Sequence, residues 1–242
     1  MIRTDRQPNE LRKSSIHTEG PGISERSILI EIGHTVVLCS ASVENRVPRF
    51  LRNQTGGWLT AEYGMLPGST AQRKKRSRGP HLDGRDQEIQ RLIGRSLRAI
   101  IDLETLGERT ITLDCDVLQA DGGTRTASIT GAYVALVRLL RNMQSSGELK
   151  RWPLLSPIAA TSVGIVNGYP LLDLEYREDS IAQVDLNVVM NGKERIIEIQ
   201  GTAEGHPFDR TELDNLLDLA THGMRRLFRL QKETIDRFPV NP

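Results

Sequence analysis

A glycine turn at Gly122-Gly123 carries the residue types that bind an anion. The glycines let the backbone approach a ligand closely and adopt dihedral angles that other residues avoid. A strand-like run precedes the turn and a long apolar run follows it, so the turn would open a helix whose first N–H groups lack internal partners. Arg125 adds a planar fork of donors that matches phosphate oxygens. The pattern predicts a phosphate site at Gly123, Thr124 and Arg125, although a plain turn with Thr126 as helix N-cap accounts for it equally well.

Two carboxylates, Asp179 and Asp185, form a second group with catalytic potential. In an extended chain they would lie about 20 Å apart, too far to share a metal ion. A helical turn starting at Asp179-Ser180 would shorten the gap to roughly 9 Å, so that both acids could bind one Mg²⁺ through oxygen ligands. We expect Asp185 and Asn187 to share one face of a strand whose other face is apolar. In the alternative interpretation, Asp179 caps a turn and Asp185 pairs with an arginine.

A run of cations in a segment without periodicity is the third feature. It predicts an exposed, mobile loop over 68–85, in which Arg73 and Arg76 are candidate RNA contacts because single strands are held largely through backbone charge. A merely solvated surface is the alternative. The cations are Arg73, Lys74, Lys75, Arg76 and Arg78.

Helices and strands must position these residues. The order is strands and then helices, twice over, which predicts an α+β fold with two structurally similar halves at 1–145 and 155–242, each a small mixed β-sheet covered by helices. An amphipathic helix at 86–103, with Asp86 as a candidate N-cap, would place Arg85 at a helix start, where an anion is also favoured. Hairpin turns are expected at Asn167-Gly168 and Asn191-Gly192. One further helix is expected to reach about 143, and another to cover 211–232. The expected strands are 27–43 (with a turn at Gly33-His34), 58–65, 109–117, 158–166, 171–176, 184–190 and 195–201.

Composition narrows the class of protein. The 242 residues are 38% hydrophobic and 26% charged, with a net charge of +1, so a nucleic-acid site must come from local clustering. Cys39 and Cys115 cannot build a disulfide framework, which suits a reducing cytoplasm. The first residues contain no apolar signal core, and no run is long enough to span a membrane. Arg3, Arg6 and Arg12 predict either a solvated arm or a surface lining.

Taken together, these segments resemble the ribonuclease PH family, bacterial phosphorolytic exoribonucleases that trim tRNA precursors. The resemblance follows the family's order and covers nearly the whole chain, so it is far more specific than any one motif. The stretches that carry it are 3–6 with 10–12, 38–43, 58–67, 87–99, 114–131 around Gly122-Gly123-Thr124-Arg125, Glu178-Asp179-Ser180 with 185–190, and 200–205.

The resemblance implies a function for each group of residues. Inorganic phosphate would bind at Arg85, Gly123, Thr124 and Arg125. The catalytic acids, which also hold Mg²⁺, would be Asp179 and Asp185. It also implies a cytoplasmic homohexamer, a trimer of dimers, that releases nucleoside diphosphates from RNA 3′ ends in a reversible reaction. The chain departs from the family at Gly68 (often arginine), the basic loop, Asp86 (usually threonine) and Gln183 (usually glutamate).

Two other functions compete with this one. The chain could be a non-catalytic, RNA-binding ring subunit, but the presence of Arg85, Arg125, Asp179 and Asp185 together argues against that. A metal-dependent hydrolytic nuclease would not need a phosphate pocket.

Overall fold

The computed structural model describes residues 3, 5–20, 22–51, 55–76, 83–205 and 207–238. Its first sheet is mixed, with the order β1-β2-β3-β5-β4, because β4 runs parallel to β5 and the other pairs are antiparallel. Its second sheet, β7-β6-β8-β9, is antiparallel. The strands are β1 Ser14–His17, β2 Ser27–Ile32, β3 Thr35–Glu44, β4 Trp58–Met65, β5 Thr110–Gln119, β6 Ile158–Val166, β7 Tyr169–Leu172, β8 Val184–Asn191 and β9 Ile196–Ala203.

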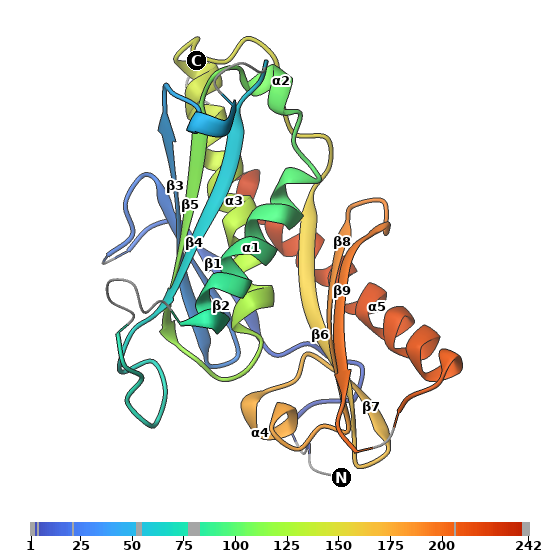
Figure 1. Cartoon of the computed structure of the whole chain (residues 1–242). Helices are drawn as coiled ribbons and strands as arrows, with labels where there is room; N and C mark the ends of the chain where they lie inside the picture. Colours follow the sequence, from blue (N-terminus) through green and yellow to red (C-terminus); the bar gives the residue numbers. More distant parts are fainter. Residues whose placement is uncertain are drawn as a thin grey trace.

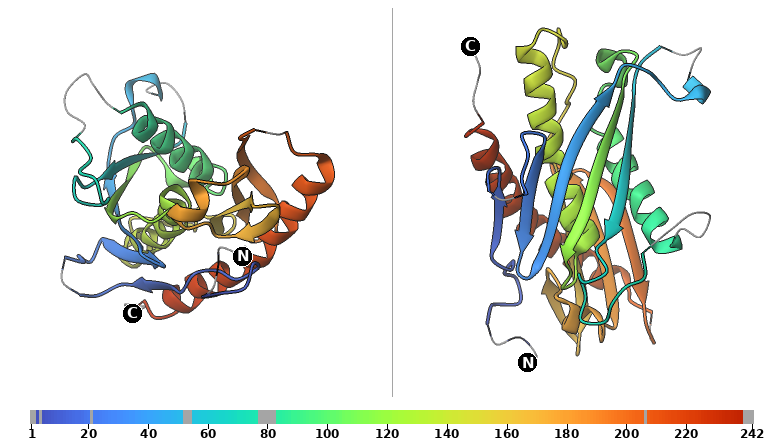
Figure 2. Two further views of the ribbon diagram at one scale, coloured as in Figure 1. Left: turned by 90° about the horizontal axis from the view of Figure 1, so that it is seen from below. Right: turned by 90° about the vertical axis from the view of Figure 1, so that its left-hand side faces the viewer.

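The helices lie between and beside the two sheets (Figure 1). α1 packs on β4, α3 lies between the sheets, and α5 covers the outer side of the second sheet, as the two further views also show (Figure 2). The predicted α+β fold with two sheets and covering helices is confirmed, except that only the first sheet is mixed and the second is antiparallel. The helices are η1 Arg49–Leu51, α1 Gly84–Arg98, α2 Leu103–Leu106, α3 Thr124–Ser145, α4 Tyr176–Asp179 and α5 Arg210–Ile235.

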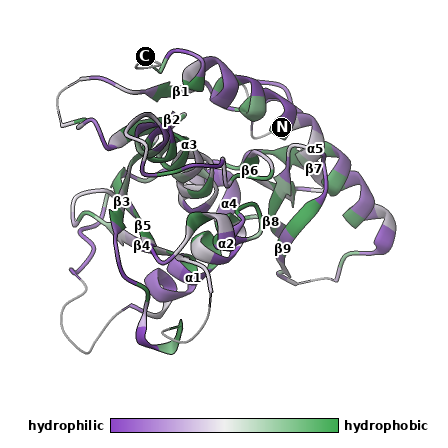
Figure 3. Cartoon of the chain, turned by 90° about the horizontal axis from the view of Figure 1, so that it is seen from above, coloured by the Kyte–Doolittle hydropathy of each residue, from purple (hydrophilic) through white to green (hydrophobic). Residues whose placement is uncertain are grey.

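α3 is apolar nearly all round because both of its sides are covered. Its buried residues contact β2 and β3 of the first sheet and β6 of the second. Ile158 and Ala160 of β6 belong to the same apolar cluster as the first sheet, so the two halves share one core instead of meeting at a wet interface. α5, in contrast, carries both hydrophilic and hydrophobic residues around its circumference (Figure 3), as expected for a helix with one exposed side.

The two faces of β8 have different partners. Val184, Leu186 and Val188 are buried in the cluster that α5 covers. Asp185 and Asn187 alternate with them and therefore point to the other side of the sheet, as the sequence predicted. α5 packs on the face of the second sheet that carries Val184, Leu186 and Val188. Val189, on the same face as Asp185 and Asn187, belongs to the apolar cluster that contains α3.

Three local predictions need correction. The N-cap of α1 is Asp83, whose side chain accepts a hydrogen bond from the Arg85 amide, and not Asp86. The helix expected at 86–103 is interrupted after Arg98, and α2 follows as a separate turn. The strand expected at 171–176 ends at Leu172 because the chain turns into α4. The second hairpin forms at the predicted place, and its strands end and begin within one residue of the expected positions.

Among the described residues, no helix combines the length and the apolar composition needed to cross a bilayer.

Candidate active site

The glycine turn begins α3 in a left-handed conformation. Gly122 has a φ of 75° and Gly123 a φ of 66°, which residues with a Cβ rarely adopt. Gly123 is the N-cap and supplies no side-chain acceptor, so no cap side chain covers the first amides of α3. Thr126 is not the N-cap: its hydroxyl donates to the Gly123 carbonyl at 2.9 Å. The geometry therefore leaves a helix N-terminus open to an anion.

Gly122 also brings this turn against the start of α4. A Cβ at this position would lie 2.7 Å from the Leu174 carbonyl oxygen and 2.8 Å from the Tyr176 nitrogen. A larger residue would force the two segments apart. Only glycine permits the close approach that places α4, and with it Asp179, beside the N-terminus of α3.

Asp179 and Asp185 lie near each other, although the chain shortens the gap differently from the prediction. The helical turn comes before Asp179, which ends α4, and a further turn follows as the Ala182 amide donates to the Asp179 carbonyl at 3.2 Å. Burial raises the pKa of Asp179. Burial and the Asp179 charge raise the pKa of Asp185 to about 6. Such shifts are typical of acids grouped in a cleft.

Asp185 has a side-chain hydrogen-bond partner in Asn187, which lowers its pKa, but that partner does not reach both of its carboxylate oxygens. The Oδ1 atom of Asp185 is buried without a hydrogen bond among the described residues, and Asp185 forms no ion pair with an arginine of the described part of the chain. The described part of the chain therefore gives no support to the alternative in which Asp185 pairs with an arginine. A buried carboxylate oxygen without a partner is costly, which is the expected condition of an acid that awaits a ligand.

Arg85 and Arg125 approach the two acids from the other half of the chain. Both guanidinium groups lower the pKa values of Asp179 and Asp185 and so oppose the effect of burial. Arg125 is mostly buried, and its Nη1 donates to Gln200 Oε1 at 2.9 Å and to Glu88 Oε1 at 3.3 Å. Arg85 is exposed. Two cations, two acids and a helix start thus share one site between the sheets.

Tyr63, Glu88 and Gln200 support the site and were missed as site residues at the sequence level. The Tyr63 hydroxyl contacts Thr124 Oγ1 at 2.9 Å, and burial raises the pKa of Tyr63 to about 12, so the phenol stays neutral. The Gln200 amide donates to Glu88 Oε1 at 3.1 Å and thereby fixes both acceptors of Arg125. The signal for Glu88 was its spacing of three residues from Arg85 on one helix.

The early arginines are neither a solvated arm nor a surface lining. Arg3 donates from Nε and Nη2 to the two carboxylate oxygens of Glu178, both at 2.7 Å. Arg6 contacts Glu178 at 3.1 Å and Asp173 at 3.4 Å, and Arg12 completes the cluster through Asp173. Because Glu178 precedes Asp179, this buried network holds α4 in place from the N-terminal segment.

The described part of the basic loop does not expose all its cations. Arg73, Lys75 and Arg76 are exposed, whereas Lys74 is turned toward α1. Arg76 also lines a hollow of about 290 Å³ with Tyr63 and other residues of β4 and α1. Arg78 lies outside the described residues.

Comparison with known proteins places this geometry in a family. The model of the 3′ exoribonuclease family, domain 1, matches residues 10–140, and that of domain 2 matches residues 156–223. The chain belongs to the 3′ exoribonuclease family. It is 54% identical over 232 residues to the Ribonuclease PH of Synechococcus sp. (strain CC9605), an alignment that covers 96% of this chain and 94% of that protein.

Solved structures share the fold of this exoribonuclease at lower identity. The Archaeoglobus fulgidus exosome with RNA bound to the active site has a chain that matches with a TM-score of 0.75 at 21% identity, over 95% of this chain and 91% of that one. Rice (Oryza sativa) Rrp46 matches with a TM-score of 0.75 at 17% identity, over 96% and 99% of the two chains. At such identities the likeness shows the fold alone.

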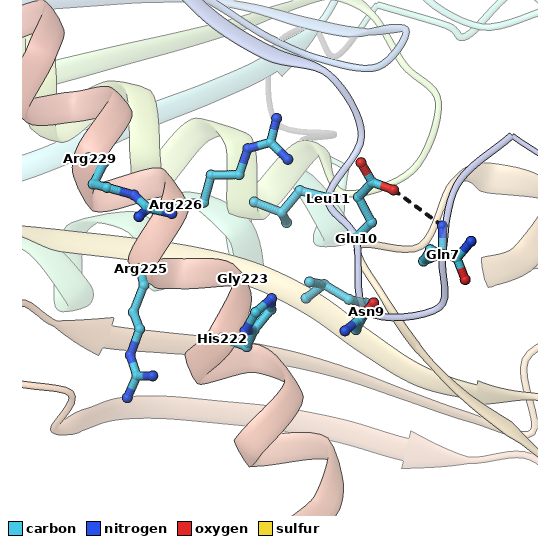
Figure 4. A pocket seen from close by; sticks show the side chains of 10 residues that line it. Gln7, Asn9, Glu10, Leu11, His222, Gly223, Arg225, Arg226 and Arg229 are labelled. Carbon is cyan, nitrogen blue, oxygen red and sulfur yellow. Dashed lines mark hydrogen bonds between the residues drawn. The ribbon is translucent and has the colours of Figure 1, made fainter.

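A separate hollow of about 470 Å³ lies between the N-terminal segment and α5 (Figure 4). Arg225, Arg226 and Arg229 of α5 line it, together with residues 7 and 9–11. α5 packs on the face of the second sheet opposite Asp185, so this hollow is not part of the candidate active site of the exoribonuclease.

Proposed function

We propose that the chain is a phosphorolytic 3′→5′ exoribonuclease that shortens tRNA precursors with inorganic phosphate and releases nucleoside diphosphates. The observation that carries the proposal is the arrangement of Arg85 and Arg125, with the open start of α3, against Asp179 and Asp185. A hydrolytic nuclease needs acids but no anion site beside them. The identity to a protein named Ribonuclease PH over nearly the whole chain supports the same function.

In this mechanism, the chain binds and orients a second anion next to an anionic substrate. Arg125, preset by Glu88 and Gln200, and the exposed Arg85 neutralise inorganic phosphate, while Gly123 and Thr124 offer the amides of the helix start. A phosphate oxygen attacks the last phosphodiester in line and the 3′ oxygen of the shortened RNA departs. An acid with a pKa of about 6 suits proton donation to that oxygen near neutral pH, and Asp185 has this pKa.

Asp179 and Asp185 also fit a magnesium ion. Carboxylate oxygens are the ligands that Mg²⁺ prefers, and the Oδ1 of Asp185 is buried without a partner among the described residues. Mg²⁺, when bound, supplies positive charge that stabilises the charge developing on the transferred phosphoryl group. A metal ligand is ionised and a proton donor is not, so these two roles of Asp185 predict opposite responses to pH.

RNA would approach along the basic loop. Arg73, Lys75 and Arg76 are exposed, and the hollow beside Arg76 adjoins Tyr63, which in turn contacts Thr124 of the phosphate site. Contacts of this kind position RNA through its backbone without reading its bases. The two buried free thiols, Cys39 and Cys115, suit the reducing cytoplasm in which such a substrate occurs.

We also propose that six copies form a ring, a trimer of dimers. The solved structures that share this fold include an archaeal exosome core and an exosome with RNA bound to the active site. In this chain, β9 carries exposed Ile196 and Ile199 at an edge of the second sheet. Such an edge requires covering. Light scattering at micromolar protein and near-physiological salt should give the mass of six chains, and the mass of a single chain would exclude the ring.

One assay tests the reaction itself. A 3′-extended tRNA precursor is incubated with Mg²⁺, with and without inorganic phosphate, and the released nucleotides are separated. We expect shortening only with phosphate and release of nucleoside diphosphates. Monophosphates released without phosphate would establish a hydrolase, and binding without shortening under both conditions would establish the non-catalytic ring subunit, which the close identity to a named ribonuclease does not favour.

A further inference from the structure

Lys74 differs from its neighbours in the basic loop because it points inward. Its ammonium group donates to Asp86 Oδ1 at 2.7 Å and lies 3.1 Å from Asp83 Oδ2. Its side chain is 21% exposed, and that of Asp86 is 8% exposed. Arg73, Lys75 and Arg76 on either side are exposed. Among the described cations of this run, Lys74 is therefore the one that forms ion pairs with the start of α1.

The backbone around Lys74 is fixed as well. The Lys74 amide donates to the Pro67 carbonyl at 3.0 Å, and the buried Ser69 accepts from the Ala120 amide at 2.8 Å. Ala120 directly follows β5, which leads to the glycine turn. The segment from Pro67 to Lys74 is thus a closed loop attached to the phosphate side of the first sheet, and it presents the lysine at the start of α1.

The two acids that Lys74 contacts flank Arg85. Asp83 caps α1 and accepts from the Arg85 amide at 3.0 Å, and Asp86 follows Arg85 directly in the first turn. The Lys74 ammonium offsets part of the negative charge of the two carboxylates, which would otherwise attract the Arg85 guanidinium more strongly and repel an incoming phosphate more strongly. Acids at a helix start are favourable for the helix but unfavourable for an adjacent anion site, so the site needs a neutralising group.

We propose that Lys74 is a positioning residue of the phosphate site: by binding Asp83 and Asp86 it leaves the guanidinium of Arg85 available to inorganic phosphate. This inference rests on the proposed phosphate-binding role of Arg85. It assigns different roles to the cations of the loop. Lys74 affects phosphate binding through Arg85, whereas the exposed Arg73, Lys75 and Arg76 contact RNA.

The test measures the KM for phosphate and the KM for RNA separately. Lys74→Met should raise the KM for phosphate about five- to tenfold, the effect of one partly buried charge near an anion, with little change in the KM for RNA. Lys74→Arg should stay near the wild type. The matched control, Lys75→Met, removes an exposed charge one residue away and should show the reverse pattern.

A second substitution distinguishes neutralisation from simple support of α1. Asp86→Asn in the Lys74→Met background removes the acid that the lysine neutralises, so the KM for phosphate should return to within about threefold of the wild type. If Lys74 only stabilises the helix, losing Asp86 as well should leave the KM as high as in the single variant or higher. Either that result or an unchanged KM in Lys74→Met would overturn the proposal.

Arg85→Ala separates failure of this inference from failure of the proposed site. If Arg85→Ala raises the KM for phosphate and Lys74→Met does not, Lys74 has no part in the phosphate site and the site stands. If neither variant changes it, Arg85 does not bind phosphate and both proposals fall. Circular dichroism and melting of each variant at the assay temperature establish that the compared proteins are folded.

Discussion

Arg12 donates hydrogen bonds to both carboxylate oxygens of Asp173, from Nε at 3.0 Å and from Nη2 at 2.7 Å. The Nη2 group also reaches the Gly122 carbonyl at 3.4 Å. Arg12 thus joins the glycine turn of the first half to the segment before α4 in the second half. Burial would raise the pKa of Asp173, but Arg12 holds it below its ordinary value, so the pair stays ionised inside the protein.

Replacing Arg12 should therefore damage the fold and the site together. We expect Arg12→Met to lower the free energy of unfolding by about 3–5 kcal/mol, because it leaves the Asp173 carboxylate buried with one partner fewer. Denaturant unfolding measures this. Since the pKa of Asp173 is depressed, the stability that the pair contributes is present above pH 4 and is lost as the pH falls further. Arg225→Met removes an exposed pair with Glu194 and should cost under about 1 kcal/mol; equal losses would mean that burial of the Arg12 pair does not matter.

Arg125→Ala should remove phosphate binding without unfolding the protein. The guanidinium contributes a charged contact to a shared anion site, and its loss should cost about 2–3 kcal/mol, or roughly 30- to 150-fold in the KM for phosphate. Steady-state phosphorolysis of a short oligonucleotide at varied phosphate measures the change. Arg91→Ala, at an exposed position on α1, is the control for general loss of positive charge. An unchanged phosphate dependence in Arg125→Ala would take Arg125 out of the site.

Asp185→Asn should abolish turnover and keep RNA affinity. The amide preserves the shape of the side chain but can neither carry a negative charge for a metal ion nor donate an acidic proton. We expect a fall of at least about a hundredfold in kcat, with an RNA dissociation constant near that of the wild type. Near-normal turnover at saturating Mg²⁺ would show that Asp185 is structural.

The same substitution should make the protein more stable at neutral pH. The pKa of Asp185 is raised to about 6 from an ordinary 3.8. Ionisation of its carboxyl group therefore lowers the free energy of unfolding as the pH rises from about 4 to 6. In buffer without Mg²⁺, Asp185→Asn should therefore gain of order 1–3 kcal/mol relative to the wild type at pH 7 and little at pH 4. Denaturant unfolding at both pH values tests this, and an equal difference at both would mean that ionisation of Asp185 is not the cause.

The regular elements could be predicted because their patterns are local. Alternation along β2 and β8, and the apolar face of α5, follow from nearest neighbours in sequence, and Asn167-Gly168 forms the predicted tight hairpin with φ values of 51° and 77°. The boundaries at Arg98 and Leu172 could not be predicted, because the chain turns there to meet distant segments: Leu155 donates to the Ile100 carbonyl, and the Leu172 amide donates to that of Pro8.

The sequence predicts the candidate-site residues whose own type indicates their chemistry. It does not predict those whose role depends on a partner far away in the sequence. Gly123, Arg125 and Asp185 stand out by type and spacing. The bond between Arg3 and Glu178 joins residues 175 positions apart, and nothing local to Arg3 distinguishes a buried cation from a solvated one. The sequence also does not separate Lys74 from the exposed cations, because nothing in it shows that Asp83 and Asp86 lie within reach of the lysine.

The last prediction concerns the three exposed cations Arg73, Lys75 and Arg76. Each lost contact between the protein and a phosphate of single-stranded RNA should reduce the slope of log affinity against log salt by about 0.7. Replacing all three by serine should therefore weaken binding of a tRNA precursor and reduce the slope by about 2. Phosphorolysis of a very short oligonucleotide should change little, because that substrate reaches only the residues around Arg125 and Asp185. Lys74 is kept in this variant, so that α1 and the phosphate site are undisturbed. Equal salt slopes for the wild type and the triple variant would show that this loop is solvated surface with no contact to RNA.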